Sequence, residues 1–271
     1  MKKLEKKWQI YLYGCTGLGI NMLNLIIGSY LCSALLVGGF ETHVEEWTYL
    51  NKDLVVAGIW SILILVAKVL DGFIDLPASS LMNKIRSRWG RRRPAIVIGF
   101  IPMMIAYSLF LVPLNKEATL LNTIWFATML CIYYVSYTFT MLAFYATFSE
   151  IVSNEEDRII ISNVKSVCDV VYFVLGYALI PAFVSMGMNI RLIAVIFMPL
   201  AFLFHYWKLN LLSVPFIIRD MFVLCLKNTI PAIISVQVSL IMLSIERVSL
   251  RAASIIPASS ETGINAPESP P

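Results

Sequence analysis

Three charged residues inside a long apolar segment are the strongest candidates for chemistry. Lys68, Asp71 and Asp75 follow one another at spacings of three and four residues, which places them on one face of a helix. Two carboxylates one turn apart repel each other when both are ionised, and a bound sodium ion or proton relieves that repulsion. We therefore predict a cation site at Asp71 and Asp75, with Lys68 supplying the neutralising charge when the cation leaves. The alternative interpretations are a structural ion-pair cluster, or an Asp75 that merely lies at the cytoplasmic interface.

The segment that carries these charges is one of several predicted membrane-spanning helices. The 271 residues are 59% hydrophobic and only 14% charged, whereas soluble domains carry about 25% charged residues. A helix crosses the hydrocarbon core with roughly 20 apolar residues. We predict an all-α membrane protein with spans at 9–38, 54–76, 94–113, 121–148, 166–186 and 190–209. A charge near the centre of a span costs about 2.5–3.5 kcal/mol, so the charged face must meet a polar cavity or other helices.

Basic residues set the expected orientation. They dominate the N-terminus and residues 84–93, so we expect a cytoplasmic N-terminus in the cell (inner or plasma) membrane. These basic residues are interspersed among apolar spans, so they do not indicate nucleic-acid binding. After residue 209 we expect a cytoplasmic interdomain segment at 210–228, a seventh span of marginal length at 229–245, and a disordered Ser/Pro-rich tail at 246–271.

A second set of candidate residues lies in the fourth and fifth spans. Lys165 and Asp169 are one helical turn apart. Lys165 could simply extend its charge to the membrane edge, and Asp169 could contact substrate or cation, or form a packing salt bridge. Tyr137 and Tyr145 belong to an aromatic cluster that could stack against sugar rings or serve only packing or an interface belt. The cysteines and histidines show no metal-ligand spacing, so we expect no metal site and no cofactor.

Residues 68–94 resemble one transporter family closely. The segment KVLDGFIDLPASSLMNKIRSRWGRRRP is similar to the second helix and following loop of the glycoside–pentoside–hexuronide:cation symporters, melibiose permease-like members of the major facilitator superfamily. A looser similarity follows at residues 137–158, including Glu150 and Arg158, and the resemblance as a whole covers roughly residues 8–230. It implies a six-helix N-terminal bundle of a major facilitator transporter.

The resemblance also implies roles for particular residues. Asp71 and Asp75 resemble the carboxylates that bind the coupling cation, H⁺ or Na⁺, and Thr138 resembles a hydroxyl ligand. The substrate is then a sugar, such as a glycoside, or a related small solute, with Lys165, Asp169, Tyr137 and Tyr145 as candidate binding residues. A gating loop would brace the cytoplasmic side through Asn83, Arg86, Arg88, Gly90, Arg91 and Arg93.

The sequence departs from the family pattern at several positions. Ile74 stands where a polar cation ligand can occur, which favours protons over sodium. Met141 replaces an acidic sugar-binding residue, and a thioether is only a weak hydrogen-bond acceptor, so the substrate need not be a simple sugar. Pro77 is displaced by one position because Leu76 follows Asp75, and Ser79 replaces a loop glycine.

Length and rival functions leave several interpretations open. Family members have twelve helices in two halves that hold the substrate between them. We therefore expect a truncated or frameshifted product, one half of a split or homodimeric transporter, or a fragment with another role such as a non-transporting membrane scaffold. A lipid-modifying membrane enzyme is disfavoured. Asp71-Gly72 resembles the opening of the CDP-alcohol phosphotransferase signature, but the later residues of that signature are missing.

Overall fold

All regular structure in the described part of the chain is helical. The computed structural model describes residues 6–40, 45–84, 92–152 and 154–212. In chain order the elements are α1 (Lys7–Cys15), α2 (Leu18–Leu25), the π-helical η1 (Ile26–Leu31), the short 3₁₀ turns η2 (Val37–Gly39) and η3 (Glu45–Trp47), α3 (Ala57–Lys84), α4 (Arg92–Phe110), α5 (Leu120–Ile151), α6 (Glu155–Ser185) and α7 (Ile190–Leu211). No strand occurs in these ranges, which confirms the all-α prediction.

The predicted spans correspond to these helices. Five helices are long and apolar enough to cross a membrane, and α4 contains a shorter apolar helix, Pro94–Phe110. The largest difference lies in α6, which begins at Glu155 and not near residue 166. Its first turn is acidic, which favours a helix N-terminus but gives no apolar signal in the sequence.

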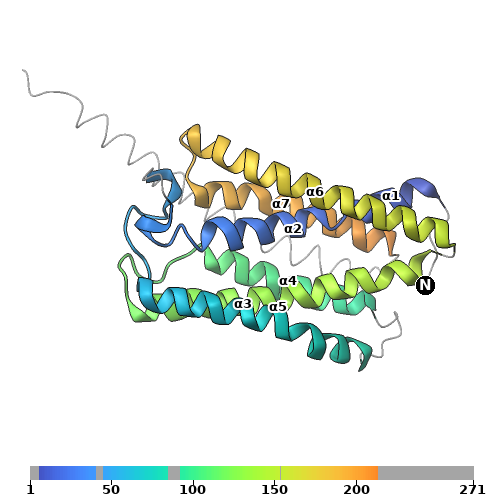
Figure 1. Cartoon of the computed structure of the whole chain (residues 1–271), viewed down its shortest axis with the longest axis horizontal. Helices are drawn as coiled ribbons and strands as arrows, with labels where there is room; N and C mark the ends of the chain where they lie inside the picture. The colour runs from blue at the N-terminus through green and yellow to red at the C-terminus, as the bar shows by residue number, and fades with distance from the viewer. Residues whose placement is uncertain (1–5, 41–44, 85–91, 153, 213–271) are drawn as a thin grey trace, which may run out of the picture.

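The helices form two groups of three: one group is the consecutive helices α3, α4 and α5, and the other joins the first span to the last two helices, α6 and α7. In one group α5 packs against α3 and α4, and in the other the segment from α1 to η1 packs against α6 and α7. Figure 1 shows these groups as two layers lying side by side. In chain order the six spans form two triplets, the first being α1–η1, α3 and α4 and the second being α5, α6 and α7. The first span of each triplet packs against the second and third spans of the other triplet.

The first span is interrupted and is shorter than the predicted segment 9–38. The Thr16 hydroxyl donates to the Tyr13 carbonyl at 2.7 Å where α1 ends, and such back-bonding favours a bend. Gly19 then allows α2 to approach α7 closely, because a Cβ at this position would lie 2.7 Å from Ala201 Cα. The π-helical turn η1 completes the span at Leu31.

The described residues between η1 and α3, which are 32–40 and 45–56, are fixed to one end of the bundle by side chains of the spans. The Trp60 indole donates to the Cys32 carbonyl at 3.1 Å, and the Asn122 amide donates to the Leu54 carbonyl at 2.7 Å. At the same end, Gly187 adopts φ +84°, a conformation that glycine enters readily. It thereby permits the tight turn between α6 and α7.

Several predicted segments lie outside the described residues. Helix α7 ends at Leu211, so residues 210 and 211 of the predicted interdomain segment are helical. The remainder of that segment beyond residue 212, the predicted seventh span at 229–245 and the predicted tail at 246–271 are not among the described residues.

Candidate functional site

The two carboxylates of α3 line a cavity on one side of the contact between α3 and α5. Toward its C-terminal end α3 diverges from α5 (Figure 1). The cavity has a volume of about 340 Å³. Its lining consists of Asp71, Gly72 and Asp75 from α3 and Tyr137, Thr138, Met141, Leu142 and Tyr145 from α5. The three predicted cation residues and two predicted substrate residues therefore meet in one cavity.

Within this cavity Thr138 holds one of the two carboxylates. Its buried hydroxyl donates to Asp71 Oδ1 at 2.8 Å. Asp71 is partly buried, whereas Asp75 is exposed. A hydroxyl can rotate and offer its lone pairs instead of its proton, so Thr138 can stabilise the empty carboxylate or contribute an oxygen to a bound cation.

Lys68 lies next to this cavity but does not line it. Its ammonium Nζ stands 4.3 Å from the centroid of the Tyr134 ring, a cation–π arrangement. No ion pair joins it to Asp71 or Asp75, and all three residues are in the described part of the chain. Gly28 of η1 makes room for this contact, because a Cβ there would lie 3.2 Å from the Tyr134 hydroxyl and 3.7 Å from Lys68 Nζ.

A second polar network joins α2, α5 and α6. Lys165 and Asp169 form an ion pair on α6. The Asn21 amide donates to Asp169 Oδ1 at 3.0 Å, and the Tyr137 hydroxyl donates to Asn21 Oδ1 at 3.1 Å. Lys165 Nζ also stands 4.9 Å from the centroid of the Tyr145 ring. All four predicted substrate residues therefore belong to one connected cluster.

Asn21 is the member of this cluster that sequence reasoning missed. It is only 5% exposed and uses both functions of its amide, one toward Asp169 and one toward Tyr137. The available signal was an amide within a predicted apolar span, because a buried amide costs free energy unless it is hydrogen-bonded. Its partners depend on the packing of α2 against α5 and α6, which the sequence does not reveal.

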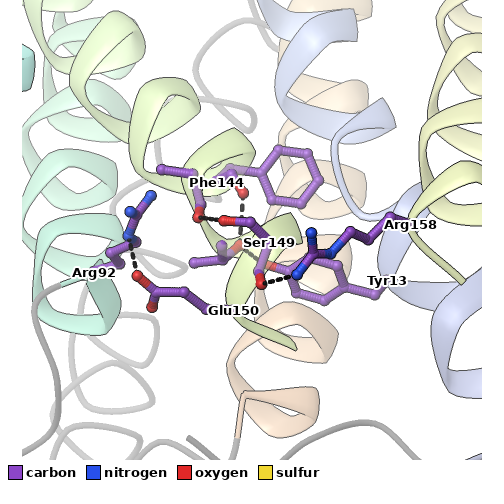
Figure 2. A network of polar contacts seen from close by, with 8 residues as sticks. Tyr13, Arg92, Phe144, Ser149, Glu150 and Arg158 are labelled. Carbon is purple, nitrogen blue, oxygen red and sulfur yellow. Dashed lines mark hydrogen bonds and ion pairs between the residues drawn. The ribbon is translucent and has the colours of Figure 1, made fainter. Parts of the chain in front are cut away.

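A third set of polar contacts lies near the start of α4 and the end of α5 (Figure 2). Arg92 Nε pairs with Glu150 Oε1 at 2.6 Å, and Arg158 Nη2 donates to the Ser149 carbonyl at 3.4 Å. Nearby, the hydroxyl groups of Tyr13 and Thr147 form a hydrogen bond between α1 and α5. These contacts tie α1, α4, α5 and α6 together at the end of the bundle where α1 begins.

Of the six residues predicted for the gating loop, two belong to the described part of the chain and four do not. Asn83 and Arg93 belong to the helical backbone of α3 and α4. The remaining four, Arg86, Arg88, Gly90 and Arg91, are outside the described residues.

The described residues contain no cluster of three or more His, Cys, Asp or Glu side chains that could hold a metal ion. The cavity offers carboxylate and hydroxyl oxygens, which suit a proton or an alkali cation.

Comparison with known protein families identifies the chain. A family described as MFS/sugar transport protein matches residues 12–209. The chain belongs to this family. It is therefore a multi-pass membrane protein of the major facilitator superfamily, and membership indicates a secondary transporter of sugars. The interleaved triplets agree with the nested three-helix repeats in each half of such transporters. No curated protein matches the sequence.

Proposed function

We propose that this chain is the N-terminal bundle of a cation-coupled symporter of the glycoside–pentoside–hexuronide type. The observation that carries the proposal is the shared cavity of Asp71, Asp75, Tyr137, Thr138 and Tyr145. A cation bound between the carboxylates would lie beside a substrate bound against the tyrosines. Such proximity lets each ligand affect the affinity for the other through direct contacts.

The coupling cation binds at Asp71 and Asp75 with assistance from Thr138. When the cation leaves, Lys68 moves from the Tyr134 ring toward Asp71, which lies one helical turn away on the same face. Ile74 lines an apolar groove on the α4 side of the contact between α3 and α5, so it adds no oxygen ligand. Because position 74, where a polar cation ligand can occur, is apolar here, we favour a proton over sodium as the coupling cation.

The substrate is a sugar, such as a glycoside, or a related small solute. Aromatic rings stack against sugar faces, and Tyr137 and Tyr145 provide such rings. Lys165, Asp169 and Asn21 provide hydrogen-bond donors and acceptors around them. Met141 lines the cavity at the position where the resemblance to melibiose permease would place an acid, so we assign hydroxyl recognition to the Asn21–Asp169 pair.

A second six-helix bundle covers the exposed faces of α3 and α6 in the working transporter. These are the least buried of the candidate spans, and they expose large apolar side chains such as Phe73, Leu76 and Val170. They also carry the charged residues of both networks. The bundle could come from a second copy or from another half, and rocking of one bundle against the other would alternate access to the cavity.

The polar contacts of α4 and α5 support the proposed gate. The pair between Arg92 and Glu150 connects the first turn of α4 to the last turn of α5. We assign this end of the bundle, where α1 begins, α3 ends at Lys84 and α4 begins at Arg92, to the cytoplasmic side of the cell membrane, because basic residues dominate the N-terminus and residues 84–93 of the sequence.

Transport in proteoliposomes tests the proposed function. The probes are radiolabelled methyl glycosides, pentosides and hexuronic acids, driven by an imposed pH or sodium gradient. Wild-type protein should accumulate at least one probe, and Asp71→Asn together with Asp75→Asn should abolish gradient-driven accumulation. Glu156→Gln, an exposed change on α6, is the control. Accumulation that stays gradient-driven in the double variant would contradict the cation site. A folded wild type that moves no probe would show that two copies of this chain do not form a transporter, which leaves a different second half or the scaffold interpretation.

A further inference from the structure

A second groove lies on the other side of the contact between α3 and α5. Its volume is also about 340 Å³. It is lined by Ile74, Pro77, Ala78 and Leu81 from α3, Ile98, Gly99 and Pro102 from α4, and Val135, Ser136 and Phe139 from α5. Ser136 is the only polar side chain in this lining. The groove is therefore chemically unlike the carboxylate cavity and cannot solvate a sugar or a cation.

The groove exists because α3 leaves α5 while α4 stays close to it. Gly99 keeps α4 against α5, since a Cβ there would lie 2.3 Å from Thr140 Oγ1. Pro77 lies within α3 and Pro102 within α4, and proline in a helix interior removes a hydrogen bond and bends the helix. Residues of both α3 and α4 therefore contribute to the gap between these helices.

One end of the groove carries a positive charge. From Ile74 to Leu81 the α3 wall runs about 10 Å along the helix axis. Lys84 follows Leu81 by three residues, on the same helical face. Its side chain is exposed, and it forms no ion pair with any described residue. The groove therefore has an apolar body inside the span and a cation at the membrane surface.

We propose that this groove binds one acyl chain of an anionic phospholipid whose phosphate is held by Lys84. The chain spans a membrane, so hydrocarbon tails are the apolar molecules present at high concentration beside α3 and α4. Basic sites at the ends of transmembrane helices bind anionic lipid head groups. The positive end selects an anionic lipid over a zwitterionic one, whereas the apolar face of another helix bundle would gain nothing from Lys84. This site is independent of the proposed transport cycle.

Native mass spectrometry of the purified full chain tests the proposal. The protein in detergent is titrated with phosphatidylglycerol and, separately, with phosphatidylcholine of the same acyl composition. We expect one saturable phosphatidylglycerol molecule, bound more tightly than phosphatidylcholine. Lys84→Gln should weaken the phosphatidylglycerol complex by about fivefold, to the level of phosphatidylcholine.

Two substitutions test the groove itself. Ala78→Phe fills it from α3 and Ile98→Trp fills it from α4, and each should abolish the saturable lipid. Leu65→Phe changes an exposed position of α3 outside the groove and should change nothing. Circular dichroism and thermal unfolding identify any variant that does not fold, and the other variant then decides. Equal binding of the two lipids to the wild type, or saturable binding that survives in a folded filled variant, would overturn the proposal.

Discussion

Tyr137 and Thr138 are neighbours on α5, yet their hydroxyl groups bond to different helices and different networks. Tyr137 donates to Asn21 on α2, which continues to Asp169 on α6. Thr138 donates to Asp71 on α3. One turn of α5 is thus the shared wall between the proposed substrate and cation sites.

Substitutions at these neighbours should separate the two affinities. Thr138→Val removes a hydrogen bond that stabilises the empty, charged carboxylate of Asp71. Protonation then becomes more favourable, so we expect the proton concentration for half-maximal uptake to fall by about tenfold. Tyr137→Phe removes a neutral hydrogen bond, so the substrate concentration for half-maximal uptake should rise by about three- to tenfold. Uptake measured against both concentrations checks this. If both variants changed the same constant to the same extent, the assignment of two networks would be wrong.

The Lys165–Asp169 pair should matter for substrate and little for stability. Both side chains are more than a quarter exposed, and such pairs at spacing i,i+4 contribute only about 0.3–0.5 kcal/mol. Asp169→Asn should therefore leave the melting temperature nearly unchanged while weakening substrate binding, because Asn21 and Lys165 lose the carboxylate that orients them. A melting temperature that falls together with uptake would instead indicate the packing salt bridge considered from the sequence.

The spacing of the charged residues predicted which of them share a helical face, but not which side chains of other helices they contact. The intervals between Lys68, Asp71 and Asp75 sufficed to place them on one helical face, and the cavity brings both aspartates together with Thr138. The position of Lys68 over Tyr134 was not predictable. It depends on the space left by Gly28 across the interface with η1, and such a tertiary contact leaves no periodic signal in the sequence.

The hydropathy pattern likewise predicted the positions of the spans but not the irregularities within them. An apolar block records only that residues are in hydrocarbon or in the core. The break after Cys15 and the π-helical turn from Ile26 to Leu31 arise from packing and hydrogen bonding. Helix α6 begins with polar residues, so its first turns lie beyond any apolar window.

Alanine substitutions at two glycines should have opposite effects on stability. Gly19→Ala would place a Cβ 2.7 Å from the backbone of Ala201, and a forced shift of this kind costs about 1–3 kcal/mol. Gly58→Ala, in the first turn of α3, meets nothing within 4 Å and should stabilise the helix by about 0.5–1 kcal/mol. Thermal unfolding in detergent measures both changes. Equal melting temperatures for the two variants would contradict the close packing of α2 on α7.

The thiols of Cys15 and Cys168 should form a disulfide under oxidation. Their sulfur atoms lie 3.0 Å apart between α1 and α6. Copper-phenanthroline should remove two electrons and two protons from the pair, and peptide mapping should then find one cross-linked peptide. Cys15→Ser should prevent the link and Cys131→Ser should not. A cross-link from Cys168 to another cysteine would show that α1 and α6 pack differently.

The ion pair between Arg92 and Glu150 permits a charge-exchange test of the proposed gate. The two groups are 2.6 Å apart, with side-chain exposures of 19% and 31%, so water screens them only in part. Arg92→Glu places two carboxylates together and should lower both the melting temperature and the uptake rate, and Glu150→Arg should do the same with two cations. The double variant restores opposite charges and should recover most of both losses. Lys116→Glu is the control, because it reverses an exposed charge in the connection at the other end of α4 and α5, so its effect should be small. A double variant no better than the worse single variant would show that this contact does not hold α4 against α5. If instead the melting temperature recovered while uptake stayed low, the pair would stabilise the bundle without taking part in gating.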